Sequence, residues 1–188
     1  MTLFEYLTAA NTLILSFAVL RVLGCVPHAL RPGRLYWVHV SWLSAAIAFC
    51  LISFWGFWSY RELEWTLPLF IGALAPTTLI YVFTSLVAPS EPSTVASWRD
   101  YFFGVRIPLL GTGVLYMGAV HSSNQALLGV SAFQLASLGP WTLLATCAIG
   151  ASSAKPRLHS VLAFGPPLLA VITILLLAQP DSLTSYAR

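Results

Sequence analysis

One stretch of the chain, residues 36–58, constrains the fold most strongly, because it is apolar throughout and contains no Asp, Glu, Lys or Arg. A transmembrane helix needs about 20 such residues to cross the hydrocarbon of a bilayer. In lipid the backbone must satisfy its own hydrogen bonds, and a helix does so within a single segment. The stretch therefore predicts a membrane-spanning helix.

Five further apolar runs follow the same pattern. Hydrophobic residues make up 58% of the chain and charged residues 8%, whereas about a quarter of an average soluble domain is charged. We therefore expect an all-α, polytopic integral membrane bundle of six transmembrane helices that forms a single domain over residues 1–188. The predicted spans are residues 2–23, 36–58, 65–87, 101–120, 126–150 and 159–178.

The distribution of basic residues predicts the orientation, because loops rich in Lys and Arg remain in the cytoplasm. Seven of the nine Lys and Arg residues flank the first, third and fifth predicted loops: Arg21, Arg31, Arg34, Arg99, Arg106, Lys155 and Arg157. These loops should be cytoplasmic, and an even number of spans then places the N and C termini both on the non-cytoplasmic side. We expect the protein in a bacterial-type cytoplasmic (inner) membrane.

Prolines and amides inside the predicted spans are candidates for function. Each proline removes a backbone hydrogen bond and bends the helix, and broken helices with polar linings form the midplane sites of many transporters. Side-chain amides are costly to leave unpaired in hydrocarbon, so each should face protein or water. Simple kinked packing is the alternative for the prolines. The predicted transport path or binding site comprises Asn11, Pro76, Thr77, Thr78, Gln134 and Pro140.

Aromatic residues are dense at the end of the second predicted span, where Phe54, Trp55, Phe57 and Trp58 surround a single glycine. Trp and Tyr prefer the membrane–water interface, so the cluster fits an aromatic belt on the outer side. The same residues are also suited to line a pocket for an aromatic or apolar ligand. Both interpretations remain open on sequence alone.

A polar cluster is predicted at the cytoplasmic face from His39, Asp100, Arg106 and His159. Hydrogen bonding at the interface is its simplest role. Metal binding, pH sensing or haem ligation by the two histidines are alternatives. No two histidines lie three or four residues apart, and the three cysteines are widely separated, so the spacing is not that of a metal site. We predict no metal site and no catalytic residue, and the cofactor stays unknown.

Three glycines, Gly104, Gly111 and Gly118, recur every seven residues in the fourth predicted span. A helix face without side chains allows close approach of another helix. The pattern predicts close packing, either within the chain or across an oligomer interface.

The function classes are narrowed mainly by what the sequence lacks. It contains no nucleophile elbow, zinc-protease, Walker or dinucleotide motif, so an enzyme is the less favoured class. An intramembrane enzyme that uses His39, His159 and Arg106 is a third alternative. The few basic residues are spread along one membrane face, which argues against nucleic acid as a partner. Carboxylates are missing from the span centres, which disfavours proton or sodium coupling. The expected partner is the lipid bilayer, and a homo-oligomer is compatible with the sequence.

The leading functional hypothesis is a small channel or transporter for an ion or small polar solute, based on the proline-broken, polar-lined helices. The alternative is a membrane-embedded sensory or cofactor-binding module, or an accessory subunit of a larger membrane complex. The two hypotheses differ in whether the polar residues line a hydrated path.

Overall fold

A computed structural model describes residues 2–129, 131 and 138–177. Every regular element in these residues is helical. The helices are α1 (Leu3–Ala29), α2 (Trp37–Phe57), η1 (Trp58–Tyr60), α3 (Leu67–Val87), η2 (Pro92–Thr94), α4 (Trp98–Leu128), α5 (Leu138–Ser152), α6 (Pro156–Leu162) and α7 (Gly165–Leu177).

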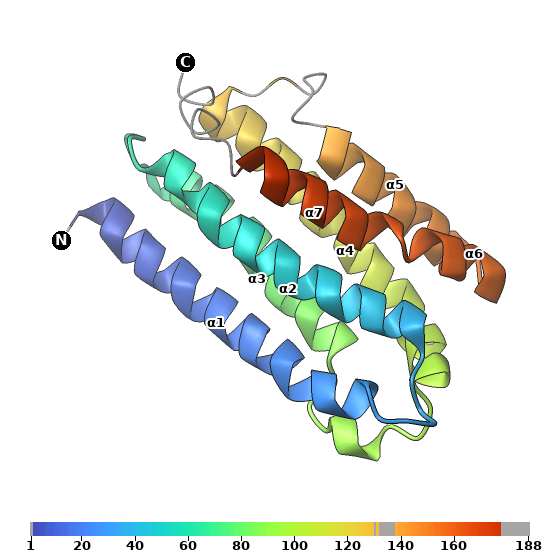
Figure 1. The fold of residues 1–188 in the computed structure, drawn as a ribbon. Coiled ribbons are helices and arrows are strands. Elements are labelled where there is room, and N and C mark those ends of the chain that lie inside the picture. Colours follow the sequence, from blue (N-terminus) through green and yellow to red (C-terminus); the bar gives the residue numbers. More distant parts are fainter. Residues whose placement is uncertain (1, 130, 132–137, 178–188) are drawn as a thin grey trace.

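The long helices run up and down beside one another, and α6 and α7 follow each other as the last pass of the bundle (Figure 1). Helix α1 packs on α2 and α3, α4 packs on α3 and α5, and α7 packs on α2 and α5. The start of α1 and the end of α7 lie at the same end of the bundle. The connections that follow α1, α3 and α5 lie at the other end, so the basic loops gather there.

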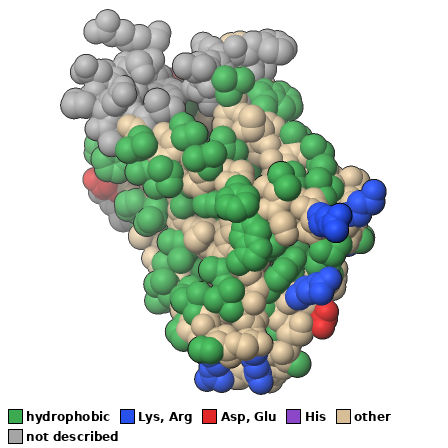
Figure 2. Space-filling view, turned by 45° about the vertical axis from the view of Figure 1, so that its right-hand side comes forward, with side chains coloured by type: hydrophobic (Ala, Val, Ile, Leu, Met, Phe, Trp, Pro, Cys, Tyr) green, Lys and Arg blue, Asp and Glu red, His purple; other side chains and the backbone are tan. Residues whose placement is uncertain are grey.

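The outer surface of the bundle is apolar, as expected for a protein embedded in lipid. Leu67, Val161 and Phe164 are 71%, 70% and 66% exposed. Figure 2 shows hydrophobic side chains over most of one face, with Lys and Arg toward its lower and right-hand edges. Five helical segments among the described residues are long and apolar enough to cross a membrane. The chain is therefore a helical membrane bundle.

The fourth and fifth predicted spans differ from the structure. Helix α4 continues to Leu128, through residues 121–125, which were predicted to be a loop. It ends at Gly129, whose φ of 64° is the left-handed conformation that terminates helices. Among the described residues, α5 runs from Leu138 to Ser152 and has 15 residues, which span about 22 Å. Residues 126–128, the predicted start of the fifth span, therefore belong to α4, and the described α5 is an apolar helix shorter than the other passes.

The sixth predicted span is made of two helices. Helix α6 ends at Leu162 and α7 begins at Gly165. Pro166 and Pro167 lie in the first turn of α7, where backbone N–H groups have no acceptor within the helix. Pro140 likewise lies in the first turn of α5, so it does not break the middle of a span.

Two backbone carbonyls are bonded by serines from neighbouring helices. Pro76 lies inside α3 and cannot donate to the carbonyl four residues earlier, that of Gly72. The Ser123 hydroxyl of α4 donates to that oxygen over 3.0 Å. The Ser41 hydroxyl of α2 donates to the carbonyl of Ala163, which caps the end of α6. These bonds pair backbone oxygens that lipid could not satisfy.

Side chains also cap the carbonyl ends of helices at the basic end of the bundle. Arg21 Nε donates to the Ala88 carbonyl over 2.8 Å, just after the end of α3. The Tyr101 hydroxyl donates to the Leu86 carbonyl, also over 2.8 Å. The last carbonyls of a helix have no partner within it and carry partial negative charge. Arg21 therefore stabilises the end of α3.

The glycines with seven-residue spacing do not pack closely against any other helix among the described residues. A Cβ atom added to Gly104, Gly111 or Gly118 would meet nothing within 4 Å. The close approach of α4 to α5 occurs instead at Gly113, where an added Cβ would lie 2.7 Å from Cys147 Sγ. Close packing between α4 and α5 thus uses Gly113. For Gly104, Gly111 and Gly118, an oligomer interface stays a prediction.

We predict that Ser123→Ala lowers the free energy of unfolding by about 1 kcal/mol, because it leaves the Gly72 carbonyl unpaired in the bundle. The loss should shrink in a Pro76→Ala background, since alanine at this position restores the backbone N–H that bonds this oxygen. Steric trapping in bicelles measures these free energies.

The matched control is Ser122→Ala, because the exposed Ser122 hydroxyl bonds only to Gly118 within its own helix. Its effect should be small and independent of residue 76. Equal losses for Ser123→Ala in the unaltered protein and in the Pro76→Ala background would contradict the assigned role.

Candidate functional site

Asn11 and Thr77 form a buried hydrogen bond between α1 and α3. The Thr77 hydroxyl donates to Asn11 Oδ1 over 2.5 Å, and the two residues are 1% and 3% exposed. This bond fixes the orientation of the amide. Asn11 Nδ2 is buried and has no hydrogen-bond partner among the described residues. A buried, unpaired amide donor costs about 1–3 kcal/mol.

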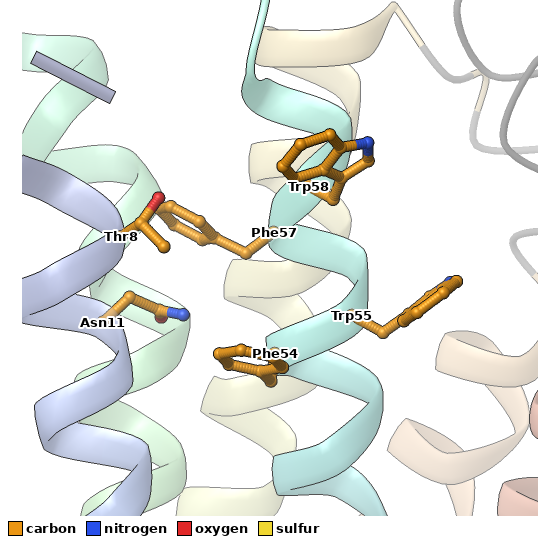
Figure 3. A pocket seen from close by; sticks show the side chains of 6 residues that line it. All are labelled: Thr8, Asn11, Phe54, Trp55, Phe57 and Trp58. Atoms are coloured by element: carbon orange, nitrogen blue, oxygen red, sulfur yellow. The ribbon is translucent and has the colours of Figure 1, made fainter. Parts of the chain in front are cut away.

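A cavity of about 310 Å³ lies between α1 and α2 beside this amide. Figure 3 shows the amide nitrogen of Asn11 directed toward α2, from which Phe54 and Phe57 project toward α1. The cavity is lined by Thr8, Asn11, Phe54, Trp55, Phe57 and Trp58. A volume of roughly 300 Å³ is at the lower end of the range for small-molecule sites. The amide is thus a polar group at the edge of an apolar cavity.

The aromatic wall is held in place by packing at the end of α2. Phe57 stacks on Phe4 with ring centroids 5.9 Å apart, and the Tyr60 ring meets it edge-on at 5.5 Å. Phe54, Trp55 and Trp58 are about half exposed, whereas Phe57 is buried. Phe57 therefore forms the packed part of the lining, and the other three aromatic residues reach the surface of the bundle.

No charged side chain lines the cavity among the described residues. The Thr8 hydroxyl donates to the Phe4 carbonyl over 2.8 Å within its own helix. Arg61 lies beyond the cavity, with its guanidinium carbon 5.4 Å from the centre of the Trp58 ring, and pairs with Glu62 at 3.0 Å. The site therefore suits a neutral molecule.

The structure joins some of the predicted path residues and separates others. Asn11 and Thr77 contact each other, and Pro76 precedes Thr77 in α3. Thr78 is exposed, and its hydroxyl donates to the Leu74 carbonyl of its own helix over 3.1 Å. Pro140 lies in the first turn of α5, and Gln134 falls outside the described residues.

The predicted cytoplasmic-face cluster is assembled in part, through aromatic rings. His39 is buried and stacks on Trp98 at 4.6 Å. His159 meets the Phe102 and Phe103 rings edge-on at 5.3 Å each, and its Nε2 lies 2.8 Å from the Ser153 carbonyl oxygen. The two histidines are thus packed into one aromatic layer.

The other two members of the cluster form no hydrogen bond with either histidine among the described residues. Asp100 is exposed, and its backbone N–H bonds to the Ser97 hydroxyl at the start of α4. Arg106 is half-buried and has no hydrogen-bond partner for Nε among the described residues. No group of three or more His, Cys, Asp or Glu side chains within the described ranges is placed to hold a metal ion.

Sequence reasoning identified the aromatic cluster but missed Thr8 as its neighbour. Thr8 and Asn11 are three residues apart, a spacing that places both on one face of α1. That spacing was the available signal. It does not reveal which of the other helices the face meets.

Comparisons with protein-family models, with curated proteins and with solved structures found no match to the chain. A function must therefore be inferred from its own residues.

We predict that Thr77→Val lowers the free energy of unfolding by about 1 kcal/mol, because it leaves Asn11 Oδ1 buried and unpaired. Thr78→Val is the matched control. It makes the same chemical change one residue away, at an exposed position, and should change stability by less than about 0.5 kcal/mol. Steric trapping of both variants checks this. Equal effects would contradict a special role for the Asn11–Thr77 pair.

Proposed function

We propose that the protein is a membrane-embedded binding module that takes an apolar ligand from the lipid into the cavity between α1 and α2. The single observation that carries this proposal is Asn11: its amide nitrogen is buried, unpartnered among the described residues and directed toward α2, beside an apolar, aromatic-lined cavity that Asn11 helps to line. A ligand that pairs this donor removes a desolvation penalty that the protein otherwise carries. The amide thus favours occupancy and selects among apolar molecules.

This proposal develops the second of the two hypotheses from the sequence. Transport of an ion or small polar solute requires polar groups that face water along a path. Here the hydroxyls of Ser41 and Ser123 bond to backbone carbonyls of neighbouring helices, and Ser53 and Tyr116 bond to each other over 2.7 Å. Groups paired in this way favour packing over conduction.

The Lys and Arg distribution favours an orientation in which both termini are non-cytoplasmic. This orientation determines in which half of the membrane the cavity lies. The cavity would lie in the outer half of a bacterial-type inner membrane, near the outer aromatic belt. The belt and pocket interpretations of residues 54–58 are then compatible, because the half-exposed Trp55 and Trp58 serve the interface while Phe54 and Phe57 face α1.

Photolabelling of the protein in phosphatidylcholine nanodiscs tests the proposal, with a trifluoromethyl-phenyl-diazirine as an apolar aromatic probe. Labelling of cavity residues should saturate with probe and fall when unlabelled trifluoromethyl-benzene is added in excess. Labelling of residues that merely face lipid should do neither. Peptide mapping separates the two groups.

Thr8→Phe should reduce the saturable labelling at least several-fold, because the larger side chain fills part of the cavity. Leu115→Phe is the matched control, since Leu115 is 62% exposed on the outer face of α4. If labelling at the cavity never saturates, or if both variants reduce it equally, the proposed function is wrong. Stability measurements on both variants confirm that each is folded.

A further inference from the structure

The chemistry of the cavity restricts its ligand to one that offers a hydrogen-bond acceptor. Thr77 already donates to Asn11 Oδ1, so the group that remains available is Nδ2, which has two N–H bonds and can accept none. A plain hydrocarbon would fill the cavity but leave this donor unpaired. A carbonyl oxygen would pair it.

The lining of the cavity suits a flat ring. Four of its six lining residues are aromatic, namely Phe54, Trp55, Phe57 and Trp58. Aromatic rings pack best in offset-stacked or edge-on arrangements, which a planar ligand can make with the Phe54 and Phe57 rings. Two of these rings project from α2 toward Asn11, so a planar carbonyl compound can contact the rings and the amide together.

The depth of Asn11 argues against the ester carbonyl of a membrane phospholipid. Phe4 lies level with Phe57, because their rings stack at 5.9 Å, and Phe57 is the last residue of α2. Asn11 lies seven residues farther along α1 than Phe4, which is roughly 10 Å deeper at the rise of an α-helix. This position is within the hydrocarbon, below the polar headgroup region. A ligand that dissolves in the hydrocarbon reaches it more readily.

From these three properties we infer that the ligand is a neutral quinone, a planar membrane-soluble ring whose carbonyl oxygen accepts a hydrogen bond from Asn11 Nδ2. The inference rests on the proposed function, because it assigns a ligand class to the same cavity. It concerns binding alone. Among the described residues, no charged side chain lines the cavity. The lining therefore does not favour an anionic or a cationic ligand over a neutral one.

The test uses the diazirine labelling described above and compares three competitors that partition into the nanodisc. They are 2-methyl-1,4-naphthoquinone, 2-methylnaphthalene and methyl oleate. The first two share a ring skeleton and differ in the carbonyls, while the third carries an ester carbonyl on an acyl chain. The quinone should block labelling at a membrane mole fraction roughly tenfold lower than the hydrocarbon, the factor expected for one net hydrogen bond.

Two variants test whether the Asn11 amide causes the preference for the quinone over 2-methylnaphthalene. Asn11→Leu removes the donor with little change in volume, and the advantage of the quinone over 2-methylnaphthalene should fall to about twofold or less. Ser123→Ala also removes one interhelical hydrogen bond but leaves Asn11 and its bond to Thr77 in place, so the advantage should persist. A preference that is lost equally in both variants would indicate a structural effect and overturn the inference.

The outcomes separate the inference from the proposed function. Equal competition by the quinone and 2-methylnaphthalene in the unaltered protein would refute the quinone class while leaving a cavity that binds apolar ligands. Competition by methyl oleate equal to that of the quinone would assign the site to a lipid ester and overturn the quinone class as well. If no competitor reduces the labelling, the proposed function fails with the inference.

Discussion

The need to pair every backbone polar group in lipid governs this structure. Pro76 leaves the Gly72 carbonyl without its helical donor, and the Ser123 hydroxyl from α4 takes the place of the missing N–H group. The Ser41 hydroxyl of α2 pairs the Ala163 carbonyl at the end of α6. These bonds join α3 to α4 and α2 to the last pass, so they help to specify which helices are neighbours and in what register.

The Asn11 amide is one of several buried side-chain groups without a partner among the described residues, and it is the one that borders the aromatic-lined cavity. Its oxygen is held by Thr77, while its nitrogen has no partner among the described residues. A buried polar group that is left unpaired in a native protein calls for a specific explanation, and a role in binding is one. The account of function depends on this asymmetry, since a fully paired Asn11 would be only another contact between helices.

The sequence predicted the long helices well and their ends less well. Residues 36–58 and 65–87 correspond closely to α2 with η1 and to α3, because uninterrupted apolar runs have one stable form in lipid. The polar residues 121–125 suggested a loop, yet α4 continues through them. Ser123 finds an acceptor on α3 there, a contact that depends on tertiary packing and leaves no signal in local sequence.

The individual residues of the candidate site could be predicted from the sequence, but their contacts with one another could not. The cost of an unpaired amide identified Asn11, and the density of aromatics at residues 54–58 suggested a pocket. That Thr77 bonds to Asn11 while the adjacent Thr78 does not follows from the register of α1 against α3, which hydropathy does not determine. The cytoplasmic-face cluster shows the same limit, because His39 and His159 meet through phenylalanine and tryptophan rings that sequence reasoning did not connect to them.

The environment of the Asn11 amide is the most direct test of this account. The chain contains only two asparagines, Asn11 and Asn124, so selective ¹⁵N-asparagine labelling gives two side-chain amide signals, and Asn124→Gln assigns them. The account predicts that the Asn11 amide protons show nuclear Overhauser contacts to the Phe54 and Phe57 rings and exchange slowly with water. Rapid exchange with water at this amide would contradict it and would indicate a hydrated path through the bundle.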